Sequence, residues 1–150
     1  MAVRPCAGTT LDALVAEAVN SIFRMNPGEA AEAASASATL IDIREHDVRC
    51  RDGVIPGALH IPRTVLEWRF ASASWRSPYL QQGQFILICD HGYSSILAAA
   101  TLVSLGVDAG DVVGGFEAWR AAGLPTRPAR SRYVGDPQIG DGVPGMGPPD

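Results

Sequence analysis

Apolar positions recur with a helical period in the first part of the chain. Over residues 10–23 they fall three or four positions apart, which predicts an amphipathic helix that packs one face inward. Asn26, Pro27 and Glu29 then have the spacing of a helix start, with a capping residue, a proline at the first position and a capping-box glutamate. A second helix is therefore predicted to begin there and to end near Ser35.

Shorter apolar runs, each bounded by polar or turn residues, predict strands further along the chain. Helical patterns lie between these runs, and such alternation is typical of βαβ units in an α/β fold with a mostly parallel sheet. The predicted strands are TLIDI (39–43), ALHI (58–61), QFILIC (84–89) and DVV (111–113). The predicted helices are TVLEWRF (64–70), SSILAAATLVSL (94–105) and a short helix within GGFEAWRAAGLP (114–125).

Composition changes this picture only near the C-terminus. Residues 128–150 are rich in Pro and Gly and hold almost no large apolar side chains, so they cannot bury enough surface to offset the entropy of ordering. We predict a disordered tail there. The 150-residue chain is otherwise long enough for one domain with a hydrophobic core of its own.

Charge and cysteine content narrow the class of protein. The formal net charge is −4 and the basic residues are scattered, so we expect neither nucleic acid nor a membrane as partner. Asp12 and Glu17 interrupt the N-terminal segment, and no secretory signal is predicted. Cys6, Cys50 and Cys89 are an odd set without metal-ligand spacing, which favours a reducing compartment, the cytoplasm, and predicts no metal and no cofactor.

Cys89 lies where a predicted strand ends and a predicted helix is about to begin. Ligands of open parallel sheets bind at this edge. Gly92 lets the chain curl so that the N–H groups of residues 90–95 converge, and the positive end of the helix dipole adds to their field. An ordinary thiol, with a pKa of about 8.5, is only slightly ionised at pH 7, and such donors favour the thiolate. Cys89 is therefore a candidate nucleophile, the alternative being a buried cysteine that acts as a small hydrophobe.

Four blocks of sequence resemble, in order and spacing, a single-domain rhodanese-like (thiosulfate sulfurtransferase) protein. The resemblance covers residues 25–127 and is greatest to members of the actinobacterial type. It implies a rhodanese fold, with a central, mostly parallel five-stranded sheet and helices on both faces, and a persulfide formed on Cys89. Residues 1–24 then make a helical extension packed on the domain. The four blocks are LIDIRE, GVIPGALHIP, ILICDHGYSS and VVGGFEAWRAAGLP.

The resemblance also implies which residues bind the substrate. Many relatives carry Arg where this chain has Ser94, so the positive charge is sought on Arg44, which either binds the substrate anion or pairs with Asp42 to fasten its loop. Ser94 and Ser95 either donate to the persulfide or cap the helix. The carboxylate of Asp90 is expected to repel a dianionic donor such as thiosulfate, because two unit charges ~5 Å apart repel by about 3 kcal/mol at an effective dielectric constant near 20. The predicted substrate-binding residues are Arg44, Asp90, His91, Gly92, Tyr93, Ser94 and Ser95.

The predicted reaction moves sulfane sulfur through a persulfide on Cys89. The donor is a small sulfur-containing anion such as thiosulfate, or a protein persulfide, and the acceptor is a thiol or cyanide. One alternative is a catalytically weak scaffold or redox-sensing interaction module with the same fold. A second alternative is a cysteine-dependent phosphatase, which is disfavoured because Ser94 stands where a phosphate-clamping arginine is needed.

Overall fold

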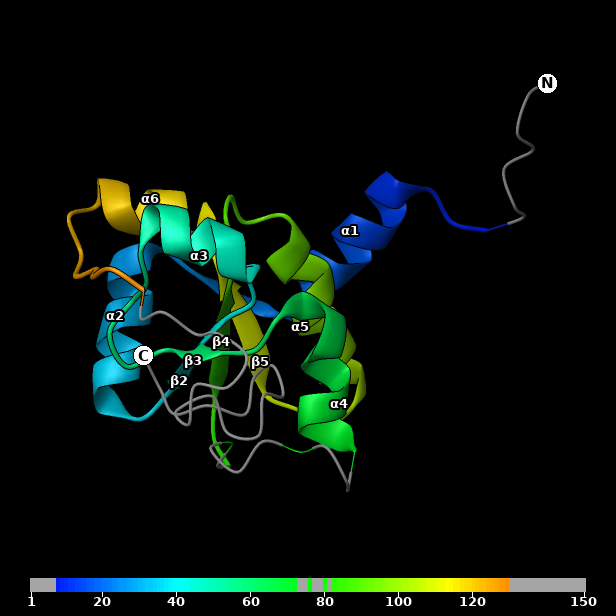
Figure 1. Cartoon of the computed structure of the whole chain (residues 1–150). Coiled ribbons are helices and arrows are strands. Elements are labelled where there is room, and N and C mark those ends of the chain that lie inside the picture. The colour runs from blue at the N-terminus through cyan, green and yellow to red at the C-terminus, as the bar shows by residue number, and fades with distance from the viewer. Residues whose placement is uncertain (1–7, 73–75, 77–79, 81, 130–150) are drawn as a thin grey trace.

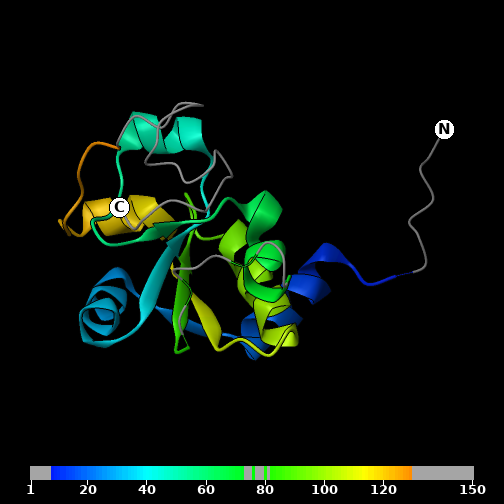
Figure 2. The same ribbon diagram turned by 60° about the horizontal axis from the view of Figure 1, so that its bottom comes forward.

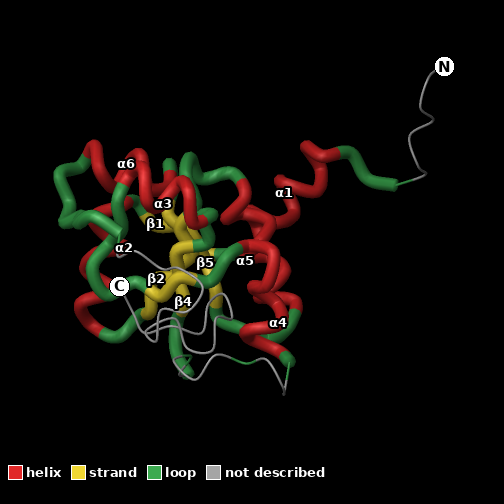
Figure 3. Tube along the Cα trace, in the orientation of Figure 1, coloured by secondary structure: helices red, strands yellow, loops and turns green. Residues whose placement is uncertain are grey.

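A five-stranded sheet forms the centre of the computed structural model, which describes residues 8–72, 76, 80 and 82–129. Every strand pairing within this sheet is parallel, and the strand order is β1-β5-β4-β2-β3 (Figure 3). The carboxyl ends of all five strands therefore meet at one edge of the sheet. The strands are β1 (Phe23–Met25), β2 (Thr39–Asp42), β3 (Leu59–His60), β4 (Phe85–Ile88) and β5 (Ala109–Val112).

Helices cover both faces of this sheet (Figures 1 and 2). One face carries α1, α4 and α5, and the opposite face carries α2 and α6. This arrangement confirms the predicted α/β fold with a central parallel sheet between helices. The helices are α1 (Leu11–Ser21), α2 (Pro27–Ala36), α3 (His46–Asp52), α4 (Leu66–Ala71), α5 (Ser94–Ser104) and α6 (Gly115–Ala121), and a 3₁₀ turn, η1 (Arg63–Val65), precedes α4.

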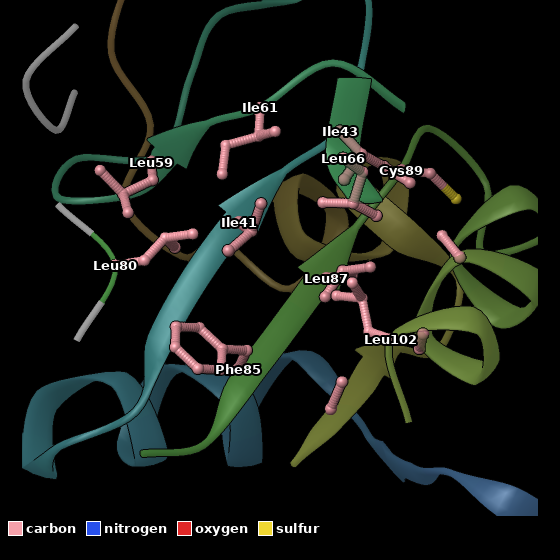
Figure 4. Close-up of a cluster of buried hydrophobic side chains, with 13 residues drawn as sticks. Ile41, Ile43, Leu59, Ile61, Leu66, Leu80, Phe85, Leu87, Cys89 and Leu102 are labelled. Atoms are coloured by element: carbon pink, nitrogen blue, oxygen red, sulfur yellow. The ribbon is translucent and has the colours of Figure 1, made fainter. Parts of the chain in front are cut away.

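Two hydrophobic clusters hold the layers together, one on each face of the sheet. Alternate residues of the central strands supply them, because successive side chains of a strand point to opposite faces. Leu87 and Cys89 belong to the cluster beneath α5 (Figure 4), whereas Ile86 and Ile88 belong to the cluster with Trp119 of α6. The uninterrupted apolar runs in the sequence reflect this burial on both faces.

The N-terminal elements agree with those predicted from the sequence, except at the end of the first helix. Asn26 caps α2 as predicted, and its side chain and that of Glu29 form the complete capping box. The helix predicted over residues 10–23 is wrong at its end, however, because α1 ends at Ser21. The chain then becomes extended at Ile22 and enters β1, where pairing with β5 replaces helical hydrogen bonds.

Two further predictions on secondary structure are corrected. No helix was predicted over residues 46–52, but these residues form α3, a helix of polar sequence that lacks an apolar period and contains Cys50. A single buried side chain, that of Arg49, ties this helix to the core. The last strand was expected over residues 111–113, but it occupies Ala109–Val112, because it pairs with β4 from Ala109 onward and with β1 from Gly110 onward.

The division between residues 24 and 25 falls inside β1, and α1 packs against α5. The predicted disordered tail lies, from residue 130, outside the described residues, as does Cys6. None of the helices in the described ranges has both the length and the apolar character that a membrane crossing requires.

Candidate active site around Cys89

Cys89 is the residue that follows β4, and its side chain points into the face covered by α5 (Figure 4). Cys89 is buried, with only 5% of its residue surface exposed. The backbone on either side is fixed by α6: the N–H of Phe116 donates to the Cys89 carbonyl at 2.8 Å, and the N–H of Glu117 donates to the Asp90 carbonyl at 3.1 Å. The first two residues of the loop are thereby held against the start of α6.

Two groups lie within hydrogen-bond distance of the Cys89 sulfur. The main-chain N–H of Gly92 donates to Sγ over 3.1 Å, and it is one of the six N–H groups, of residues 90–95, that were predicted to converge there. The thiol in turn donates to Oγ of Ser95 over 3.2 Å. Gly92 has φ +84°, and a Cβ atom on it would lie 2.6 Å from the nitrogen of Gly114. Only glycine therefore lets the loop curl this tightly against the α6 start.

Ser95 is a residue of the first turn of α5 rather than its cap. The helix begins at Ser94, and the preceding residue, Tyr93, makes no side-chain cap hydrogen bond, so the expectation that Ser94 or Ser95 caps the helix is wrong. Ser95 is fully buried and contacts Cys89, whereas Ser94 and Tyr93 are exposed. Of the two serines, Ser95 is the one beside the sulfur.

Behind Ser95 lies an ion pair that was not predicted from the sequence. The Ser95 hydroxyl donates to Oδ2 of Asp111 over 2.6 Å, and Nε of Arg24 donates to Oδ1 of the same carboxylate over 2.7 Å. Nη2 of Arg24 donates both to Asp111 Oδ2 (3.1 Å) and to the carbonyl of Gly92 (3.2 Å). The pKa of Arg24 is raised above its ordinary value, mainly by the hydrogen bond to Asp111 and further by the nearby Cys89.

A signal for this pair was present in the sequence. Asp111 is the single charged residue in the strand Ala-Gly-Asp-Val, and a carboxylate inside a buried strand requires a partner. What the sequence could not supply was the partner itself, because Arg24 precedes Asp111 by 87 positions and meets it only through the β1–β5 pairing.

Arg44 lies at the end of β2 and its contacts favour the loop-fastening alternative. Its Nε and Nη2 donate to the two carboxylate oxygens of Asp42 over 3.0 and 2.8 Å, and Nη2 also donates to the Gly53 carbonyl over 2.8 Å. The guanidinium stacks 3.7 Å from the ring centroid of Phe116, and Arg49 donates to the same carboxylate from α3. Nη1 of Arg44 is buried without a hydrogen-bond partner among the described residues, and the anion-binding role of Arg44 stays a prediction.

A small hollow of about 210 Å³ adjoins the Cys89 loop, and charged side chains of both signs line it. His91 Nδ1 lies 2.6 Å from Glu117, and Asp90 lies 4.0 Å from the other ring nitrogen of His91. Arg51 is paired with Asp52, and its hydrogen bond lowers the pKa of that carboxyl. The lining residues are Arg51, Asp52, Asp90, His91, Phe116, Glu117 and Arg120.

A larger hollow of about 600 Å³ lies on the α2 side of the sheet and contains none of the predicted site residues. It is lined mostly by small side chains of α2 and its surroundings, and Trp119 also contributes to the lining. No set of three or more His, Cys, Asp or Glu side chains within the described ranges gathers as a metal site would. The chemistry-bearing groups therefore converge at the Cys89 loop.

Comparison with known proteins gives consistent results. A family model described as "Rhodanese-like domain" matches residues 26–122. The thiosulfate sulfurtransferase GlpE of Pseudomonas savastanoi pv. phaseolicola is 35% identical over 101 residues, which cover 66% of this chain and 89% of that protein.

Two solved structures extend the comparison to the fold. A Rhodopseudomonas palustris protein, described as of unknown function and a possible tyrosine phosphatase, superposes with a TM-score of 0.74 at 30% identity, over 84% of this chain and 100% of that one. A rhodanese-related protein from Thermoplasma volcanium superposes with a TM-score of 0.58 at 28% identity, over 71% of this chain and 100% of that one. The fold is thus the rhodanese fold.

Proposed function

The chain belongs to the rhodanese-like family, and we propose that it is a sulfurtransferase that carries sulfane sulfur on Cys89 as a persulfide. The observation that carries this proposal is the position of the Cys89 sulfur at the carboxyl edge of the sheet, with the Gly92 N–H directed at it. A main-chain donor in this position stabilises negative charge on sulfur, as it stabilises an oxyanion in acyl transfer. No metal or cofactor enters the reaction that we propose.

The proposed reaction consists of two displacements. The Cys89 thiolate attacks the outer sulfur of thiosulfate, a new S–S bond forms, and the bond to the sulfonate sulfur breaks so that its electron pair leaves with sulfite. An acceptor thiolate or cyanide then attacks the terminal sulfur of the persulfide. This second step yields an acceptor persulfide or thiocyanate and returns Cys89 as a thiolate, so no external oxidant or reductant is needed.

We propose that the donor is thiosulfate, another small sulfur-containing anion or a protein persulfide, in line with the activity for which the Pseudomonas relative is named. The two cysteines in the described part of the chain, Cys50 and Cys89, are both free thiols, which supports action in the reducing cytoplasm. The exclusive use of arginine as the long basic residue supports an actinobacterial type.

Mass spectrometry of the intact protein tests the proposal. Incubation with thiosulfate, or in parallel with mercaptopyruvate, is expected to add about 32 Da, one sulfur atom, and peptide mapping is expected to place it on Cys89. Addition of cyanide should then remove the added mass. An adduct on the exposed Cys50 instead would contradict the assignment of the nucleophile, and the absence of an adduct from either donor would favour the scaffold or redox-sensing alternative.

A phosphatase is the second candidate, because the Rhodopseudomonas palustris protein is described as a possible tyrosine phosphatase. The loop of this chain has Ser94 and no arginine between Cys89 and Ser95. It therefore lacks a guanidinium group that could bind two phosphate oxygens at once. We expect no turnover of para-nitrophenyl phosphate beyond background. Turnover that depends on the Cys89 thiol would replace the sulfurtransferase proposal with the phosphatase.

The charge of Asp90 leads to a prediction about the donor. Asp90 adjoins Cys89 and lines the small hollow, and its side chain is 35% exposed, so solvent weakens its repulsion of an incoming dianion. Asp90→Asn is expected to raise kcat/KM for thiosulfate by roughly threefold to tenfold at low salt, with a smaller gain at high salt.

Steady-state formation of thiocyanate at two ionic strengths measures this effect. Asp12→Asn is the matched control, because it changes the net charge equally on α1, whose first turn lies away from the site (Figure 1). An unchanged or lower kcat/KM in Asp90→Asn would show that this carboxylate does not oppose the donor.

A further inference from the structure

A continuous row of buried hydrogen bonds connects the Cys89 sulfur with Arg24 on β1. It runs from Sγ to the Ser95 hydroxyl (3.2 Å), from there to the Asp111 carboxylate (2.6 Å), and from the carboxylate to the Arg24 guanidinium (2.7 Å). Arg24 closes the row by donating to the carbonyl of Gly92, the residue whose N–H faces the sulfur. The nucleophile, its main-chain donor and the ion pair thus form one ring of contacts.

The hydrogen atoms in this row fix the direction of each bond. A serine hydroxyl has one hydrogen atom to donate. Ser95 donates it to the Asp111 carboxylate, because this contact is shorter than the contact between Ser95 and the Cys89 sulfur. The Ser95 oxygen therefore accepts a hydrogen bond from the Cys89 thiol, and the thiol must keep its proton to donate that bond. When Cys89 ionises, Ser95 can donate to the sulfur only by giving up its bond to Asp111. Asp111 consequently favours the protonated thiol.

Arg24 acts in the opposite direction. Its guanidinium neutralises Asp111 by two hydrogen bonds and holds the Gly92 carbonyl, while its positive charge raises the potential at the sulfur. The side chain is 25% exposed, so the effect is partly screened but not lost. Arg24 also lies outside the matched residues 26–122, and family membership does not supply it.

We propose that Arg24 and Asp111 are positioning residues that set the ionisation of Cys89 in opposite directions, Arg24 favouring the thiolate and Asp111, through Ser95, favouring the thiol. Arg24 thereby provides from β1 the cation that the loop lacks at Ser94. The inference rests on the proposed function in one respect, that Cys89 is the nucleophile.

Other charged groups surround Cys89 and are left unchanged by the test. Asp90 and His91 lie on the same loop, and Glu117 lies at the start of α6. The Asp42–Arg44 pair lies at the end of β2. Because these groups are present in every variant, a difference between variants reports on the exchanged residue.

The test measures the rate at which iodoacetamide alkylates Cys89 as a function of pH, with the Cys89 peptide quantified separately from those of the other cysteines in the full chain. Arg24→Met is expected to move the midpoint of this profile upward by about one pH unit, and Asp111→Asn to move it downward by about one. Arg24→Lys is expected to restore most of the wild-type profile. The double variant Arg24→Met/Asp111→Asn is expected to lie near the wild type.

Opposite shifts separate this electrostatic role from a structural one. If the ion pair only held β1 on β5, both single variants would loosen the loop, and both profiles would move in the same direction; that result, or no movement in either, overturns the proposal. Arg63→Met, which breaks the Arg63–Glu67 ion pair on η1 and α4, is the matched control and should leave the profile unchanged. Asp111→Asn is isosteric and keeps the test valid if Arg24→Met does not fold, because the electrostatic role alone predicts its downward shift. Alkylation needs no sulfur donor, so the outcome is independent of whether persulfide formation is detected.

Discussion

Replacement of Cys89 by serine is expected to abolish sulfur transfer, with a fall in turnover of at least about 10⁴-fold. A serine hydroxyl is far less nucleophilic than a thiolate and cannot carry the sulfur as a persulfide, so neither displacement can proceed. The exchange is small in volume, and Oγ of serine can keep the contacts with Gly92 and Ser95. Thiocyanate formation from thiosulfate and cyanide measures the loss, and the thermal midpoint verifies that the fold persists.

The matched control for this prediction is Cys50→Ser. Cys50 is an exposed residue of α3, and its sulfur contacts the imidazole of His46 at 3.4 Å, a contact that could also activate a thiol. We expect full sulfur transfer in this variant, because α3 presents its thiol to solvent without loop amides. Loss of transfer in Cys50→Ser together with its survival in Cys89→Ser would move the nucleophile to α3.

The parts of the fold that the sequence predicts are those fixed by local composition. Strand β4 is apolar throughout, and β2 has the apolar pair Leu40 and Ile41, because both faces of these central strands are buried. Such short apolar runs can be recognised from the sequence alone. Cys89 could be placed at the active edge for the same reason, since a strand, a flexible loop and a helix follow one another within a short stretch. Local pattern was enough to place Cys89 at this edge of the sheet.

The parts that could not be predicted depend on contacts between distant residues. β1 is three residues long, and it forms a strand because β5 offers it a partner. Gly110 makes this close approach possible, since a Cβ atom on it would lie 2.2 Å from the Phe23 carbonyl oxygen. The Arg24–Asp111 pair depends on that same approach. The cation was sought on the neighbouring strand end, which leads to Arg44, because nothing in the sequence links Arg24 to the Cys89 loop.

Arg44 illustrates how buried contacts favour one of two roles that the sequence leaves open. An arginine at the end of a strand on the active edge reads as a substrate ligand, but the Asp42 carboxylate two positions earlier binds it in two places. Arg49 from α3 shares the same carboxylate, so one buried aspartate organises two guanidinium groups. The polar helix α3 has no apolar period for a pattern to detect, and it is this shared ion pair that anchors it.

Gly92→Ala is the second change for which a large effect is expected. Alanine at φ +84° is strained by roughly 1 kcal/mol, and its Cβ would overlap the Gly114 nitrogen, from which it would be 2.6 Å away. The loop must move away from the start of α6, which breaks the alignment of the Gly92 N–H with the Cys89 sulfur. We expect a loss in kcat/KM of about 100-fold or more and a loss of stability of about 2 to 4 kcal/mol, measured by sulfur transfer and by urea unfolding.

Gly106→Ala separates steric overlap from backbone strain. Gly106 follows α5 with φ +85°, almost the same conformation, but a Cβ atom there would meet nothing within 4 Å. It should therefore carry the strain alone, about 1 kcal/mol of stability, with sulfur transfer unchanged. Equal losses of activity in the two variants would mean that strain or global destabilisation, and not the fit of the Cys89 loop against α6, limits the reaction. A large difference between them ties transfer to the close approach of Gly92 and Gly114, which aims the main-chain donor at the sulfur.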